Sequence, residues 1–241
     1  MLKSLLNIFF SDSDSSFSFY KLYTKLTRWS LEKTLPYEYE LPDSISFDEG
    51  FWKRITQIHN ETKNDNFERA FAIFWADGEL IITGTTKGTT SSVTTNSIVT
   101  VKYSQSRHKG YLTKQIIVDS EIYSSKDVYF KNVPSKIEVK YLFNIHTHPV
   151  HMINGQERYG FFSFTDINTL VNSNAIITGM IGDKLWILFK TNKTPKVLNN
   201  YEESEISIES LTEKIKLGVY SGEFGKKLIR HRITTQAGSI G

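Results

Sequence analysis

The chain has 241 residues, 39% of them hydrophobic and 23% charged, with 29 basic and 26 acidic side chains, six histidines and no cysteine. This composition is ordinary for a globular protein and excludes a disordered chain, a collagen-like repeat and a coiled coil. Without cysteine there can be no disulfide, iron–sulfur cluster or thiol nucleophile, so a metal would have to be held by histidine and carboxylate. The near balance of charge gives no reason to expect a nucleic acid or an anionic membrane as partner of the whole chain.

The first ten residues combine a lysine with a short apolar run. This run is too short to span a bilayer and no export cleavage site follows it, so residues 1–10 predict a short helix. No other stretch is apolar enough for a transmembrane helix, and we expect a soluble, cytoplasmic protein without a membrane partner.

Residues 1–66 are expected to be a helical appendage with an acidic connector. Helical periodicity covers residues 20–31 and 51–62, and the second of these helices is expected to pack on a sheet. Between them, residues 35–48 form the proline-punctuated connector. Residues 31–50 contain six acidic side chains and a single lysine, so this part of the chain is locally acidic.

From residue 67 the periodicity changes from helix to strand. Residues 67–84 predict two strands joined at Asp77 and Gly78, the strongest short-range signal of a β-hairpin. Two further strands are expected over residues 97–103 and 111–119. Residues 137–145 become wholly apolar at their end, which is typical of a strand that enters a buried sheet.

The predicted core continues with a helix and a second hairpin. Ser163 is a helix-capping residue for residues 163–172, and residues 175–181 and 184–190 predict strands joined by a tight turn. The pattern indicates an α+β (α/β) fold with a mixed sheet flanked by helices, centred on a domain of residues 67–200.

Residues 201–241 are expected to form a basic helical region. From residue 211 onward there are six basic and two acidic side chains. Such a charge run is most often a solvated helix face, and contact with an acidic partner or a nucleic acid is the second interpretation.

His146 and His148 carry the clearest chemical signal. They lie two residues apart at the end of a predicted strand and are followed by a proline, a pattern expected about 0.003 times by chance in this chain. Because side chains two apart share a face of a strand, both imidazoles can reach one ion. Asp166 follows in the first turn of a predicted helix and can supply a third ligand. Three protein ligands with one open position are typical of a catalytic zinc site.

The Ser163-x-x-Asp166 spacing has a second interpretation. A serine three residues before an acid at a helix start is more often a capping box than part of a metal site. Both roles are compatible, because the serine can begin the helix while its hydroxyl faces the site.

Together, His-Thr-His-Pro, Ser-x-x-Asp and an upstream glutamate on a core strand resemble the JAMM signature of MPN-domain zinc metalloproteases. The resemblance covers about 125 residues, from position 67 to about 191. It implies an MPN/JAMM-like fold related to cytidine deaminases, and a zinc peptidase or isopeptidase that acts on the tail of a ubiquitin-like protein or its conjugate.

The resemblance also implies the roles of individual residues. His146, His148 and Asp166 would bind zinc, and Ser163 would hydrogen-bond the tetrahedral intermediate. Glu68 would be the catalytic glutamate, which binds the zinc-bound water and carries its proton to the leaving amine. Zinc lowers the pKa of water towards about 7, which is consistent with this division of roles.

The chain departs from the family pattern in three ways. The loop of residues 150–162 has thirteen residues where about seven are usual, and His151 within it is either a fourth ligand or a solvated side chain. The glycines that usually follow the glutamate are missing, which leaves Glu79 as a rival for its role. The helix expected before the histidine strand is not evident, and residues 124–135 stand in its place.

Two other functions are compatible with the sequence. One is a non-catalytic MPN-type scaffold protein, which a Glu68 remote from the histidines would favour. The other is a DNA-repair-associated protein of the same fold, for which the basic C-terminal region is the sole indication.

Overall fold

The computed structural model describes residues 16–232 except 78, 96, 109 and 200. Within them, ten strands form the main sheet, in the order β1-β2-β15-β14-β13-β12-β9-β3-β4 with β5 beside the start of β3. Their bounds are β1 (Ser16–Ser18), β2 (Ser44–Ser46), β3 (Arg69–Ala76), β4 (Glu79–Ile82), β5 (Thr86–Lys87), β9 (Val139–Thr147), β12 (Ile177–Ile181), β13 (Leu185–Phe189), β14 (Gly218–Gly222) and β15 (Leu228–His231). The sheet is mixed, because β9 pairs in parallel with β12 and antiparallel with β3.

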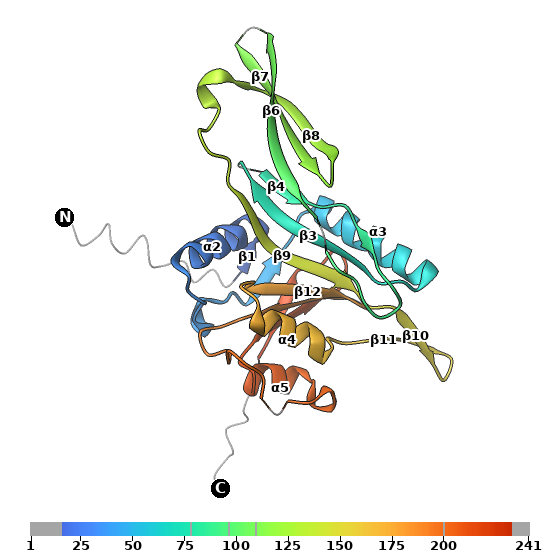
Figure 1. The fold of residues 1–241 in the computed structure, drawn as a ribbon. Helices are drawn as coiled ribbons and strands as arrows, with labels where there is room; N and C mark the ends of the chain where they lie inside the picture. Colours follow the sequence, from blue (N-terminus) through green and yellow to red (C-terminus); the bar gives the residue numbers. More distant parts are fainter. Residues whose placement is uncertain (1–15, 78, 96, 109, 200, 233–241) are drawn as a thin grey trace, which may run out of the picture.

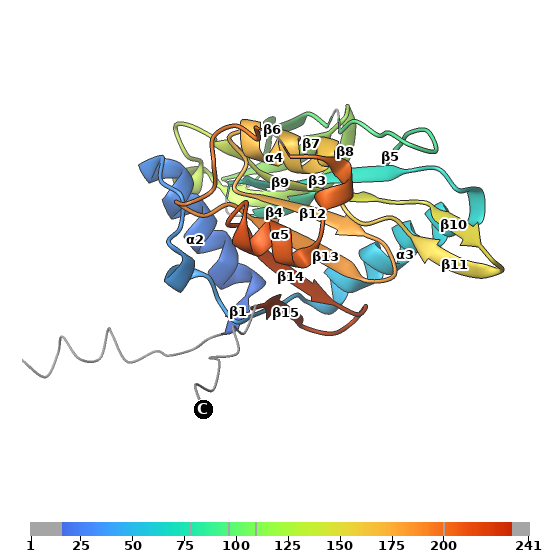
Figure 2. The same cartoon turned by 90° about the horizontal axis from the view of Figure 1, so that it is seen from below.

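Four α-helices in the described part of the chain cover the two faces of this sheet (Figure 1; Figure 2). They are α2 (Phe19–Glu32), α3 (Glu49–Asp65), α4 (Phe164–Asn172) and α5 (Ile208–Glu213). Short 3-10 helices lie at Glu38–Glu40, Phe130–Asn132 and Glu203–Glu205. The fold is therefore of the mixed α+β class, as expected, with helices on both faces of a mixed sheet. None of the described helices combines the length and the apolar character needed to cross a bilayer.

Alternating side chains of the central strands build the two layers of the core. On β13, Ile187 packs in the cluster that also contains the apolar faces of α2 and α3. Its neighbours Trp186 and Leu188 pack with α4 and α5 on the opposite face. All five residues of β13 are buried, which is typical of a strand covered on both sides.

Most predicted elements of residues 49–190 are present. The hairpins β3–β4 and β12–β13, the strand β9, and the helices α3 and α4 lie where their patterns place them. Helix α4 begins at Ser163, whose hydroxyl accepts a hydrogen bond from the Asp166 amide. Helix α2 likewise matches the predicted periodicity.

The expectation of a helical C-terminal region was wrong for most of its described residues. After the single short helix α5, the chain forms strands β14 and β15, which join the main sheet. The N-terminal region is not purely helical either, because β1 and β2 pair with each other and β2 pairs with β15. The expected boundaries at 66/67 and 200/201 therefore lie between elements of one sheet. The helix predicted for residues 1–10 lies outside the described residues.

Two smaller sheets lie outside the main sheet. Strands β6 (Val99–His108), β7 (Tyr111–Val118) and β8 (Glu121–Tyr129) form an antiparallel sheet that projects from one end of the molecule (Figure 1). Residues 124–129, where the resemblance would place a helix, belong to strand β8. The thirteen-residue loop contains the hairpin of β10 (Val150–Ile153) and β11 (Gln156–Tyr159), which extends away from the main sheet in both views (Figure 2).

Candidate metal centre

His146 and His148 lie at the carboxyl end of β9, in the middle of the main sheet. His146 is opposite Met180 of β12 and Ala70 of β3, and it is 9% exposed. Just beyond the strand, the His148 amide donates to the Ile181 carbonyl at 3.0 Å, which holds the second histidine beside β12. Both imidazoles face the side of the sheet that carries α4.

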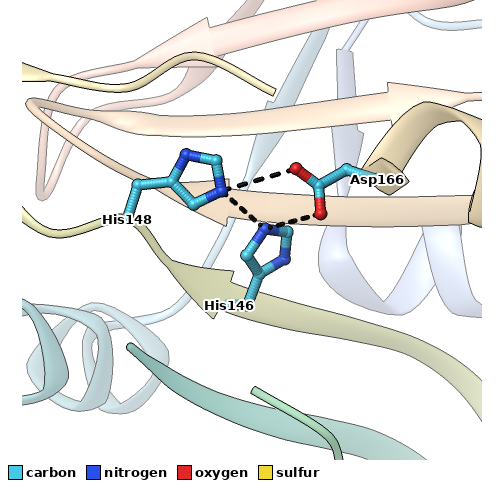
Figure 3. Close-up of side chains that lie close together, drawn as sticks. All are labelled: His146, His148 and Asp166. Carbon is cyan, nitrogen blue, oxygen red and sulfur yellow. Dashed lines mark hydrogen bonds and ion pairs between the residues drawn. The ribbon is translucent and has the colours of Figure 1, made fainter. Parts of the chain in front are cut away.

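Asp166 reaches the histidines from the first turn of α4 (Figure 3). The Nε2 atoms of the two histidines are 3.0 Å apart. Asp166 Oδ1 lies 3.2 Å from His146 Nε2, and Asp166 Oδ2 lies 3.4 Å from His148 Nε2. Among the His, Cys, Asp and Glu side chains of the described residues, His146, His148 and Asp166 form the group whose ligand atoms lie close enough together to hold one metal ion.

The spacing of these donors fits a zinc ion. Two ligands bound at about 2.0–2.1 Å in tetrahedral geometry are about 3.3 Å apart. The three measured distances, 3.0, 3.2 and 3.4 Å, are close to this value. Two nitrogens and one carboxylate form a donor set of the catalytic type, which leaves a fourth position for water or substrate.

His148 is oriented by the end of the thirteen-residue loop. Its ring also hydrogen-bonds to the backbone of Gly160. A Cβ atom at position 160 would lie 3.1 Å from His148 Nδ1, so glycine lets the backbone approach this closely. An outer hydrogen bond at Nδ1 fixes the ring and leaves Nε2 facing the ligand position.

The three donor residues interact strongly with one another. Burial alone raises the pKa of Asp166, but the hydrogen bonds from His146 and His148 outweigh burial and lower that pKa well below its ordinary value. For His148, burial lowers the pKa, whereas the hydrogen bond and charge of Asp166 raise it and prevail. The aspartate is thus held as an anion, the form that binds a metal.

Glu68 lies directly before β3, on the same side of the sheet as the histidines. It is 8% exposed. Ala70 is opposite His146, and the same antiparallel register brings position 68 to the level of His148. Burial raises the pKa of Glu68, the charge of Asp166 acts in the same direction, and the histidine charges oppose it. A buried carboxyl group with a raised pKa is suited to accept and return a proton.

The backbone of Glu68 is fixed from two sides. Its amide donates to the Thr89 carbonyl at 2.7 Å, and its carbonyl accepts from the Gly88 amide at 2.8 Å. On the β9 side, the amide of Arg69 donates to Thr147 Oγ1 at 2.8 Å. These bonds hold the start of β3 between β9 and residues 88–89.

A buried polar network behind the site was not foreseen from the sequence. Thr147 Oγ1 also hydrogen-bonds Thr62 Oγ1 of α3 at 2.8 Å. The Arg69 guanidinium forms a two-point ion pair with Asp65, at 2.7 and 2.6 Å. The sequence contains one sign of this network. Thr147 lies between His146 and His148, so strand alternation directs its side chain to the face of the sheet opposite the histidines.

Ser163 is adjacent to Asp166 rather than to the histidine pair. Its hydroxyl and its amide both lie 2.8 Å from Asp166 Oδ2, and its hydroxyl also accepts from the Asp166 amide at 3.2 Å. The structure therefore contains the capping box, and the same serine is one of the residues that line the cavity at the candidate site.

Glu79 and His151 are not part of the donor set. Glu79 lies at the other end of β3–β4, where it pairs with Lys126 and, at 2.8 Å, with the buried amine of Lys114. His151 is an exposed residue of β10 that lines the same cavity. Of the two candidate glutamates, Glu68 is therefore the one at the site.

The acidic segment of residues 31–50 and the basic C-terminal region contact each other next to the paired strands β2 and β15. Arg230 donates to Glu38 at 3.2 Å, and Arg232 pairs with Asp43. The positive charge of this region is thus partly neutralised within the molecule, which weakens the indication of a nucleic-acid contact.

Comparisons of the chain with protein-family models, with curated proteins and with solved structures find no match. The chemical interpretation of the site therefore depends on its own residues and their arrangement.

Proposed function

We propose that the protein is a zinc-dependent metallopeptidase or isopeptidase of the JAMM type. The observation that supports this most directly is the convergence of His146, His148 and Asp166 on one point, with Glu68 buried on the same side of the sheet. The order of elements also agrees with an MPN/JAMM-like fold: helix, glutamate-bearing hairpin, histidine strand, Ser/Asp helix and closing hairpin. The inserted sheet β6–β8 and the hairpin β10–β11 would be additions to that fold.

His146, His148 and Asp166 would hold the zinc. When bound, zinc acidifies a water molecule and polarises the carbonyl of the scissile amide. Asp166 would stay anionic, supported by its hydrogen bonds from the Ser163 amide and hydroxyl.

Glu68 would accept the proton from the attacking water and deliver it to the departing amine. Its burial supports this role, because a raised pKa brings a carboxyl group closer to the pH at which it must both accept and release a proton. Its backbone hydrogen bonds to residues 88 and 89 hold the main chain of Glu68 beside the site without the glycines usual in the family.

Ser163 would turn its hydroxyl from Asp166 to the developing oxyanion. The serine amide, which also donates to Asp166, would keep the start of α4 in place during that change. A hydrogen-bond donor placed at an oxyanion typically contributes about 10²–10³ in rate.

The proposed substrate is a protein with an extended tail, by resemblance a ubiquitin-like protein or its conjugate, in the cytoplasm. The two alternative functions gain little support. A non-catalytic scaffold does not require a glutamate near the histidines, yet Glu68 lies there. The basic region that indicated a DNA-repair-associated protein is partly neutralised by acidic side chains of the same molecule.

Metal analysis of protein purified without chelators is the first test. We expect about one zinc per chain, lost in His148→Ala and retained in Glu68→Gln. His151→Ala is the matched control, because it removes a histidine of the same cavity that lies outside the donor set, and it should keep its zinc.

Hydrolysis is then measured on amide-linked fluorogenic substrates and on isopeptide-linked conjugates of ubiquitin-like proteins, including ones whose tail is uncharged over its last four residues. Glu68→Gln should reduce the rate by about 10²-fold or more while its zinc content is unchanged. Protein that contains no stoichiometric zinc, or a Glu68→Gln variant as active as the wild type, would overturn the proposal.

A further inference from the structure

The candidate centre lies at one end of a long cavity of about 970 Å³. The cavity begins at the histidines and the first turn of α4 and continues to Ser173 and Asn174, beyond the last turn of that helix. A nine-residue helix is about 13 Å long, which matches about four residues of an extended chain. The cavity is thus a groove that can hold a substrate segment next to the scissile bond.

One wall of the groove is a row of hydroxyl groups on α4 and its C-cap. Thr165, Thr169 and Ser173 are spaced four residues apart and therefore follow one face of the helix. Thr165 and Thr169 are exposed, so a ligand in the groove can reach them.

The other wall and the floor are also uncharged, with hydroxyl and amide groups among apolar side chains such as Val93 and Leu142. Thr90, Ser91 and Ser92 line the groove from the β3 side, opposite α4 across β9. On the floor, the Thr178 hydroxyl donates to Asn144 Oδ1 at 3.0 Å.

No lysine or arginine contributes to the described lining of this cavity, and its carboxylates are confined to Glu68 and Asp166 at the metal end. Charged residues make up 23% of the chain, so a groove that is neutral beyond the first turn of α4 is an unusual part of its surface. At the far end, Leu26 and Ile176 add an apolar surface.

A charged side chain in such a groove would lose water without gaining a partner, which is unfavourable. Hydroxyl and amide groups, in contrast, can hydrogen-bond the backbone of any extended peptide. We propose that the groove selects substrates whose segment beside the scissile amide is uncharged over about four residues, with Thr169 at the middle of the selecting wall. This inference depends on the proposed function, because it concerns the substrate of the same site.

The test measures binding and cleavage separately. Fluorescent eight-residue peptides made of Ser, Ala and Gly are compared with versions that carry one Lys or one Glu at each central position. Binding is followed by fluorescence anisotropy on zinc-loaded Glu68→Gln protein. We expect the neutral peptide to bind at least about tenfold more tightly than the charged ones.

A charge placed in the wall should change this preference. In Thr169→Glu, a peptide with Lys at one matching position should become the tighter ligand by about tenfold, and Thr169→Lys should favour Glu there. Asn172→Glu is the matched control, because Asn172 is an exposed residue of α4 outside the cavity lining and its substitution should leave the preference unchanged.

The outcomes separate the two hypotheses. If the neutral peptide binds selectively but the wild type cleaves none of the peptides, the groove inference stands and the proposed function fails. If cleavage occurs at equal rates for neutral and charged peptides, the groove inference is overturned and the proposed function stands. Absence of both binding and cleavage overturns both.

Discussion

Thr147→Val tests the network that connects the histidine strand with β3 and α3. Thr147 lies between the two metal-site histidines in sequence, yet it faces the opposite side of the sheet and is 0% exposed. Its hydroxyl accepts from the Arg69 amide and hydrogen-bonds Thr62. Valine keeps the shape of the side chain and removes both interactions.

The expected loss follows from those two bonds. The Arg69 amide would be left in the interior without its acceptor, which costs about 1–3 kcal/mol, and the bond to Thr62 contributes about 0.5–1.5 kcal/mol. The added methyl group regains up to about 0.8 kcal/mol. We therefore expect the free energy of unfolding to fall by about 1–4 kcal/mol, with a central value of about 2 kcal/mol.

Guanidinium unfolding, followed by tryptophan fluorescence, measures this change. Thr147→Ser is the control, because it keeps the hydroxyl and loses one methyl group, for about 1 kcal/mol. In a Thr62→Val background, Thr147→Val should cost less, by about 0.5–1.5 kcal/mol, since one of its bonds is already gone. The reasoning is refuted if Thr147→Val is no more destabilising than Thr147→Ser.

Two further variants test the ion-pair cluster and the far side of the sheet. Burial alone raises the pKa of Glu79, but hydrogen bonds to Lys114 and Lys126 prevail and lower this pKa in the folded protein. The ionised Glu79 side chain therefore stabilises the fold above the unfolded pKa of about 4.3, and this stabilisation is lost as the pH falls through the pKa of the folded protein. Glu79→Gln should therefore lower the unfolding free energy in urea by roughly 1 kcal/mol at pH 7 and by less at pH 3, and a difference that grows in acid would contradict this. Ile45→Ala should cost about 2–4 kcal/mol, because Ile45 is 0% exposed and opposite Leu228. Ile229→Ala, at a neighbouring position of β15 that is 47% exposed, should change stability by less than about 0.5 kcal/mol, and equal effects of the two would refute the burial of Ile45 in the core.

Local signals explain which elements could be predicted. The turn residues Asp77 and Gly182 and the cap at Ser163 each act through bonds within a few residues, so a short window of sequence contains them. Strands β2 and β15 have three and four residues, too few to show a period, and their pairing joins positions 45 and 228. No local pattern contains that contact, so the basic run at the C-terminus, taken by itself, predicts a helix face.

The candidate site likewise contains residues that local patterns predict and others that they do not. Strand alternation alone places His146 and His148 on one face, and the helix start places Asp166 in reach of a neighbouring strand. The position of Glu68 depends instead on the register between β3 and β9, which is set by the pairing of strands about 75 residues apart in sequence. The groove could not be predicted from the sequence. Its two walls, residues 90–92 and α4, come close to each other only in the folded sheet, where they lie on either side of β9.

The pairing of β14 with β13 has a consequence for any shortened form of this protein. A fragment of residues 67–200 would contain the whole candidate centre but would lack β14, and β13 would become an edge strand with unpaired backbone groups. All five residues of β13 are buried in the full chain, so that edge would be apolar on both faces. Such an edge promotes association between copies. The distant ends of the chain thus protect the centre of the sheet from aggregation.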